Sequence, residues 1–125
     1  MFRTVLRVGS SVLDAADSGY RLNLPVRSVP GSAEVSPLVV VSSPQVLVEA
    51  VKLAEDRSGD VVVRLYEASG GRATDVGVSF GFDVAAVDAV DLLERPVGSG
   101  TWAAGEPVVL TLRPFEIVTL RVRRG

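Results

Sequence analysis

The feature that most constrains the fold is a series of short β-forming stretches separated by turn residues. DVVVRLYEA, residues 60–68, is rich in β-branched and aromatic residues, a composition that favours a strand. RATDVGVSFGFDV, residues 72–84, alternates around Val76, Val78 and Phe80, as a half-buried strand does. Further stretches of this kind are MFRTVLRV (1–8), GYRLNLPV (19–26), PLVVVSS (37–43), VVLTLRP (108–114) and EIVTLRVRR (116–124).

This spacing of eight or nine short stretches predicts an all-β fold, an antiparallel β-sandwich of about 8 strands. The sequence shows no internal repeat and no change of composition that would mark a second domain, so we expect a single domain over residues 1–125. Residues 27–37 and 95–107 are rich in Pro, Gly and Ser and are predicted to be loops.

The segment QVLVEAVKLAE, residues 45–55, is ambiguous. Ser43 could cap a helix that Gly59 ends. The polar stretch EDRSGD (55–60) instead suits the turn of a β-hairpin, and the strand that follows it suits the second arm. The residues alone favour the hairpin without excluding the helix. AVDAVDLLE, residues 86–94, is ambiguous in the same way.

Charge and composition exclude several classes of function. The net charge is -2 and the basic residues are scattered, which gives no electrostatic footprint for nucleic acid or an anionic membrane. Arg121, Arg123 and Arg124 near the C-terminus are interpreted as solvated charges on a last strand. The longest apolar run, PLVVV, is too short to span a membrane. The N-terminus does not resemble a signal peptide, and we predict a cytoplasmic location.

The sequence contains no cysteine and no histidine. Disulfides and thiol chemistry are therefore excluded, and the commonest general base and zinc ligand is missing. A metal site could use only carboxylates and carbonyls, which suit calcium, but no spaced acidic loop of that kind is present. We expect no metal and no cofactor in this chain.

Four stretches, taken together, resemble one family. They are LNLP (22–25), VEAVKLAEDRSGDVVVRLYEASG (48–70), VDLLE (90–94) and LRPFEIVTLRV (112–122). They are similar in order and spacing, over roughly residues 20–123, to elements of the C-terminal β-domain of glycoside hydrolase family 38 α-mannosidases. The resemblance implies that residues 45–68 are two antiparallel strands joined at 56–60, and that residues 86–94 are a strand.

The resemblance also implies a function. In these enzymes the zinc, the nucleophilic aspartate and the acid/base residue lie in an N-terminal α/β domain, and this chain resembles only the last β-domain. We therefore expect a non-catalytic domain that packs against and supports the catalytic part of the enzyme, which alone would hold zinc. Self-association of the isolated domain as a homodimer through one apolar face is a further expectation.

Two other functions remain open from the sequence: an autonomous carbohydrate-binding β-sandwich module and an independent immunoglobulin-like interaction domain. Binding modules usually stack sugars on exposed aromatic residues. This chain has one Trp, two Tyr and four Phe for its whole core, which favours the supporting domain. Trp102, between Gly100 and Gly105, is predicted to cover the end of the sandwich rather than to stack a sugar.

No residue is predicted to be catalytic. The candidate docking or structural residues are Asn23, Arg64, Tyr66, Glu67, Glu94, Phe115 and Glu116. Strand alternation places Arg64 and Tyr66 on one face and Glu67 on the other. Arg64 is interpreted as either pairing with a neighbouring strand or making a bidentate contact with the rest of the enzyme.

The remaining candidates have local structural interpretations. Glu116 is expected to accept backbone hydrogen bonds that fix a corner, and Asn23 to bond to its own backbone. Phe115 is predicted to lie in the core. The acidic residues that could imitate a glycosidase pair, Asp56, Asp60, Glu67 and Glu94, are interpreted as structural.

Overall fold

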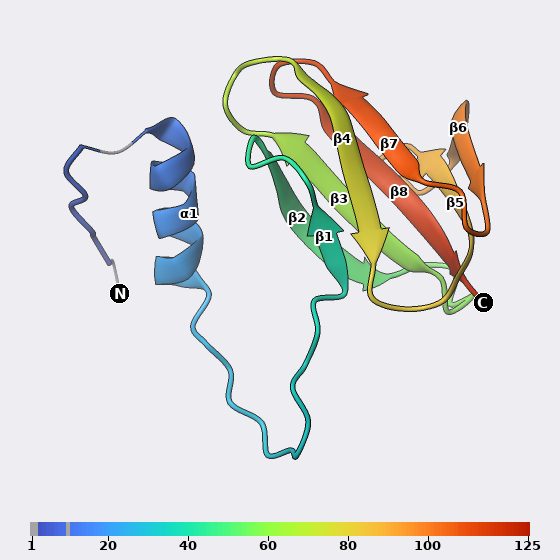
Figure 1. Cartoon of the computed structure of the whole chain (residues 1–125), viewed down its shortest axis with the longest axis horizontal. Helices are drawn as coiled ribbons and strands as arrows, with labels where there is room; N and C mark the ends of the chain where they lie inside the picture. The colour runs from blue at the N-terminus through green and yellow to red at the C-terminus, as the bar shows by residue number, and fades with distance from the viewer. Residues whose placement is uncertain (1–2, 10) are drawn as a thin grey trace. The chain divides into compact units, whose positions relative to one another are not determined.

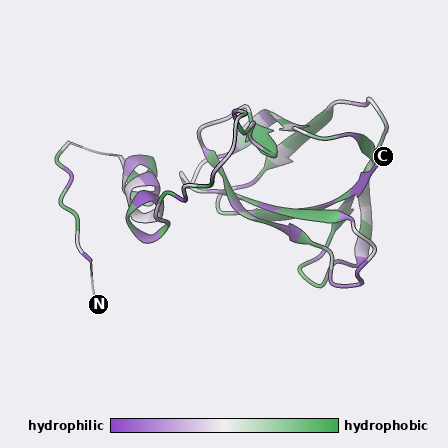
Figure 2. Cartoon of the chain, turned by 90° about the horizontal axis from the view of Figure 1, so that it is seen from below, coloured by the Kyte–Doolittle hydropathy of each residue, from purple (hydrophilic) through white to green (hydrophobic). Residues whose placement is uncertain are grey.

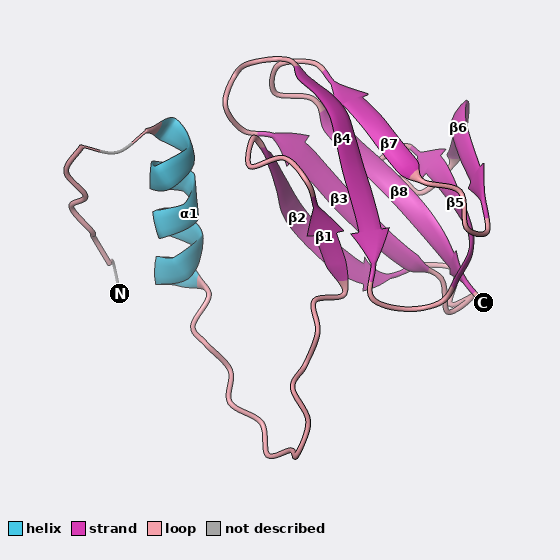
Figure 3. Cartoon of the chain, viewed as in Figure 1, coloured by secondary structure: helices cyan, strands magenta, loops and turns pink. Residues whose placement is uncertain are grey.

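The computed structural model describes residues 3–9 and 11–125. The chain forms two compact units, Met1–Val35 and Ser36–Gly125. Figure 3 shows that the helix lies in the first unit and that the strands lie in the second. The prediction had placed the sandwich over residues 1–125, whereas the first strand begins at Val39.

The first unit contains the helix α1, Val12–Asn23. The hydroxyl of Ser11 accepts a hydrogen bond from the Asp14 N–H at 3.2 Å, and the Asp14 carboxylate accepts one from the Ser11 N–H at 3.0 Å. This reciprocal capping begins the helix. No residue of α1 is buried, and it carries both hydrophilic and hydrophobic residues (Figure 2). No described helix is long and apolar enough to cross a membrane.

The prediction of strands at residues 1–8 and 19–26 is wrong. Residues 3–8 have no regular structure, and residues 1–2 lie outside the described part of the chain. Gly19 to Asn23 form the last part of α1. Pro25 restricts Leu24 to an extended conformation, and it thereby ends the helix instead of continuing a strand. The predicted loop at 27–37 contains no helix or strand and is confirmed.

The second unit is an antiparallel β-sandwich, as predicted (Figure 1). One sheet has three strands in the order β1-β4-β7: Val39–Val41, Ala73–Phe80 and Val108–Leu112. The other has five strands in the order β2-β3-β8-β5-β6: Val46–Leu53, Val61–Glu67, Ile117–Arg124, Val84–Val90 and Pro96–Ala103.

The hairpin predicted over residues 45–68 is confirmed, and the helix alternative is wrong. β2 and β3 pair antiparallel from Val46 opposite Glu67 to Leu53 opposite Val61. A bulge between Val48 and Ala50 shifts the register once, which adds local twist to the strand.

Two other predictions need correction. The predicted loop at 95–107 contains β6, because Ala103 and Trp102 pair with Ala86 and Val87 of β5, a long-range contact that outweighs the low strand preference of its glycines. The predicted strand at 86–94 ends at Val90. There the Asp91 side chain accepts hydrogen bonds from the backbone N–H groups of Leu93 and Arg95, both at 2.9 Å, and these form a turn.

The core lies between the two sheets. Its fully buried members are Val63, Leu65, Val76, Val87, Leu112, Leu120 and Val122. Figure 2 shows the strands of this unit around a central space, which these side chains fill. Successive residues of a strand point to opposite faces, so Arg64 and Tyr66 lie on the outer face of the five-stranded sheet.

Candidate functional site

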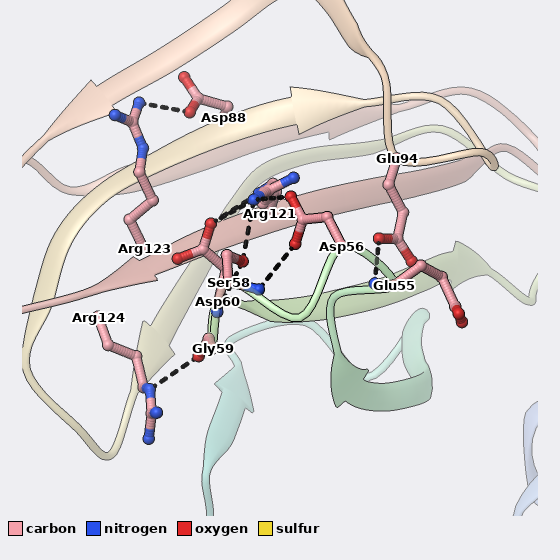
Figure 4. Close-up of polar contacts among 10 residues, drawn as sticks. All are labelled: Glu55, Asp56, Ser58, Gly59, Asp60, Asp88, Glu94, Arg121, Arg123 and Arg124. Atoms are coloured by element: carbon pink, nitrogen blue, oxygen red, sulfur yellow. Dashed lines mark hydrogen bonds and ion pairs between the residues drawn. The ribbon is translucent and has the colours of Figure 1, made fainter.

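The turn between β2 and β3 is fixed to β8 by Arg121 (Figure 4). The Arg121 guanidinium lies 2.7 Å from carboxylate oxygens of both Asp56 and Asp60, and it donates to the Ser58 hydroxyl at 3.1 Å. Hydrogen bonds from Ser58, and then the one from Arg121, lower the pKa of Asp56 to about 2. These contacts close a turn, so both aspartates have structural roles.

A second cluster joins the β5–β6 loop to β2. Glu94 Oε1 lies 2.7 Å from Lys52 Nζ. Glu94 Oε2 accepts a hydrogen bond from the Glu55 N–H at 2.9 Å, which Figure 4 shows. The Glu94 side chain is only 8% exposed. The hydrogen bond from Lys52, and then the one from Glu55, lowers the pKa of Glu94. Glu94 has a positive φ of 64°, a conformation that non-glycine residues rarely adopt.

This contact places the loop across the sheet. β5 is separated from β2 by β8 and β3 in the strand order, so residues 91–95, here called the strap, span both strands. Val62, Val90 and Thr119 are buried although they do not belong to the inter-sheet core. A strap over the outer face accounts for their burial.

Glu67 is a fully buried carboxylate at the end of β3. It accepts hydrogen bonds from the backbone N–H groups of Ser69 and Gly70, both at 2.8 Å, and of Phe115 at 3.1 Å, and it also bonds the Ser69 hydroxyl. Burial alone would raise its pKa, but the hydrogen bonds from Ser69, Phe115 and Gly70 outweigh burial and lower it to about 2. Glu67 therefore holds two loops together as an anion.

The β7–β8 turn contains Phe115 and Glu116. Glu116 accepts from the Arg113 N–H at 2.7 Å and from the Arg113 guanidinium at 3.0 Å, so it fixes the corner as predicted. The core position predicted for Phe115 is wrong, because its side chain lies at the tip of the turn and is 70% exposed. Its φ is 58°, and its ring lies over Gly70.

Two further candidates lie elsewhere. Asn23 is the last residue of α1, and its side chain donates to the backbone carbonyl of Gly19, four residues earlier, at 2.8 Å rather than to its own backbone as predicted. Trp102 is partly buried and packs against the core. A side chain at Gly100 would meet the Trp102 ring. These contacts place the Trp102 ring against the protein rather than free to stack a sugar.

The outer face of the five-stranded sheet carries a hollow of about 460 Å³ lined by Glu49, Arg64, Tyr66, Leu92, Phe115 and Ile117, here called the outer hollow. It brings together the predicted residues Arg64, Tyr66 and Phe115. The sequence did not single out Glu49, Leu92 and Ile117, although all three lie in stretches that carry the family resemblance. Among the described residues no group of acidic side chains is arranged to hold a metal ion.

Comparison with known families decides the assignment. The family model of the glycosyl hydrolases family 38 C-terminal beta sandwich domain matches residues 45–120, more than half of the chain. The chain belongs to this family. A comparison with curated proteins found no match.

The family 38 match includes three of the four stretches on which the resemblance rested, in whole or for the greater part of their length, and it leaves LNLP outside. Five charged residues of these stretches lie in the clusters described above: Lys52 and Glu94, Asp56 and Arg121, and Glu67 with the turn that holds Phe115. In this family 38 domain these motif residues therefore close loops around the sandwich.

Proposed function

We propose that this chain is the non-catalytic C-terminal β-sandwich of a family 38 α-mannosidase and that it packs against and supports the catalytic part. The zinc and the reacting groups would belong to that part. The residues described here do not fit a zinc site, because the chain has no histidine and its described acidic residues form no metal-binding group.

The observation that carries the proposal is that the carboxylates of the family motifs, Asp56, Glu67 and Glu94, are bound by other groups of this domain. Glycoside hydrolysis uses one carboxyl group that stays protonated to donate a proton and a second that is ionised. The pKa values of Asp56 and Glu67 are lowered to about 2, and that of Glu94 is also lowered. All three are anions near neutral pH, so none of them can act as the acid.

A carbohydrate-binding module is the second candidate, because Phe115 is exposed and shares the outer hollow with Tyr66. An exposed aromatic ring beside polar side chains is a surface on which a sugar can stack.

The cytoplasmic location stays a prediction.

The test uses the catalytic part of the parent α-mannosidase, produced without its C-terminal sandwich and here called the catalytic polypeptide. We expect the chain to form a complex with it, seen by analytical ultracentrifugation, and to lengthen the half-life of its mannosidase activity on warming. An absence of both effects would contradict the supporting role. Binding of an α-linked mannobiose by the chain alone, measured by calorimetry, would favour the carbohydrate-binding module.

A further inference from the structure

The outer hollow exposes apolar side chains that are not buried within the fold. Leu92 is 58% exposed, Phe115 70% and Ile117 55%. They come from three separate elements, the strap, the β7–β8 turn and β8, and they line one hollow. Single exposed apolar residues are ordinary, but a group of them in one depression marks an interaction surface.

The side chains around this hollow are held in place. The strap that carries Leu92 is fixed by Glu94 through Lys52 and the Glu55 N–H. The turn that carries Phe115 is fixed by the bond from its N–H to Glu67. Glu94 and Phe115 both have left-handed φ angles, which persist only when surrounding contacts impose them and which cluster at functional sites. The hollow is thus preorganised, which lowers the entropic cost of binding.

Arg64 indicates what the hollow would bind. Its Nε atom is buried and has no hydrogen-bond partner, the one such side-chain atom among the described residues. A buried N–H donor without an acceptor is costly. The guanidinium is cationic at all accessible pH values and prefers a carboxylate acceptor. Arg64 as a whole is partly exposed and lines the hollow, so the complement of this site is an acidic oxygen that pairs with its guanidinium, beside an apolar side chain.

We propose that the outer hollow is the surface that docks onto the catalytic part of the enzyme. The occupant is a segment with an apolar side chain between Leu92, Phe115 and Ile117 and a carboxylate that accepts from Arg64. This inference rests on the proposed function and adds to it the surface and the chemistry of the partner. A second copy of the chain fits less well, because Glu49, the acidic residue in the hollow, is already engaged in an interaction.

The test compares variants for binding to the catalytic polypeptide by analytical ultracentrifugation. Leu92→Glu places a charge in the apolar part of the hollow, and Arg64→Lys keeps the charge but removes the planar guanidinium that pairs with a carboxylate through two hydrogen bonds. Val109→Glu is the matched control, because Val109 is 48% exposed and lies on β7 of the other sheet. Thermal unfolding of each variant checks that it folds. We expect Leu92→Glu and Arg64→Lys each to weaken binding about tenfold or more, and Val109→Glu to bind like the wild type.

The outcomes separate this inference from the proposed function. If the wild-type chain binds and Leu92→Glu and Arg64→Lys bind equally well, the docking surface lies elsewhere, while the supporting role stands. If the wild-type chain does not bind at all, the supporting role itself fails. If the chain alone forms a dimer that Leu92→Glu abolishes and Val109→Glu preserves, a second copy occupies the hollow and the choice of partner is overturned.

Discussion

The carboxylate of Glu67, at the end of β3, accepts a hydrogen bond at 3.1 Å from the backbone N–H of Phe115, in the turn between β7 and β8. The same carboxylate accepts from Ser69 and Gly70 in the loop that follows β3. One buried side chain thus joins the loops at one end of the sandwich, and it fixes a wall of the outer hollow.

Replacing Glu67 with glutamine tests this role. In Glu67→Gln the amide NH2 group would replace one carboxylate oxygen and would face backbone N–H donors. At least one of these part-buried N–H groups would then lose its acceptor. We expect the free energy of unfolding to fall by about 2 kcal/mol or more, measured by urea denaturation. Glu34→Gln, on an exposed loop residue, is the control and should change stability by less than about 0.5 kcal/mol. Equal effects of the two substitutions would show that Glu67 is not an anchor.

The same carboxylate predicts a dependence of stability on pH. Its pKa falls from an ordinary 4.5 to about 2 on folding, so the unfolded state binds more protons between these values. Its contribution to stability is therefore present above about pH 4.5 and is lost as the pH falls toward 2. We expect urea unfolding of the wild type to weaken steeply over this window, and the curve of Glu67→Gln to be flatter. Parallel curves would contradict the assignment.

Gly70 predicts a steric effect that can be separated from backbone strain. Its φ is 78°, and a Cβ there would lie 2.8 Å from Phe115 Cζ. Gly105 has nearly the same φ, 77°, but open space around it. We expect Gly105→Ala to cost about 1 kcal/mol for the left-handed backbone alone, and Gly70→Ala to cost more. Adding Phe115→Ala to Gly70→Ala should recover the difference, and thermal or urea unfolding of the four proteins measures it.

How much of the fold and of the candidate site could be predicted from the sequence depends on how far apart in the chain the interacting residues lie. The strand at 61–67 follows from its own β-branched residues, and its alternation correctly separates Arg64 and Tyr66 from Glu67. The strand at 46–53 did not follow from periodicity, since helical and strand spacings were both present. The family resemblance decided it, and its pairing with β3 confirms that decision.

The errors have identifiable physical causes. The helix α1 was missed although Ser11 and Asp14 have the spacing of a capping box, because the surrounding valines and leucines read equally well as strand. β6 was missed because its glycines suggested a loop, whereas its pairing with β5 is a long-range contact. The contact of Glu94 with Lys52 has the same origin, and no local pattern could reveal that the strap crosses the sheet.

The strap itself yields a prediction about local dynamics. The Glu55 N–H donates to Glu94 Oε2 at 2.9 Å, so Glu94→Ala should leave this amide without its acceptor and release residues 91–95. We expect faster hydrogen exchange at the amide of residue 55 and in the strap, measured by NMR. Glu55→Ala is the control, because it keeps the backbone N–H and the Glu94–Lys52 pair, and its amide should stay protected. Equal exchange rates at this amide in the two variants would contradict the strap.

The last prediction concerns activity. A glycosidase of either stereochemistry needs a carboxyl group that is protonated near neutral pH, and the pKa values of Asp56, Glu67 and Glu94 are all lowered. We therefore expect the purified chain to show no hydrolysis of an aryl α-mannoside, with or without added zinc. The catalytic polypeptide, assayed beside it, provides the positive control. Turnover by the chain that a chelator abolishes would require a metal site that its described residues do not form, and would overturn the assignment of a supporting domain.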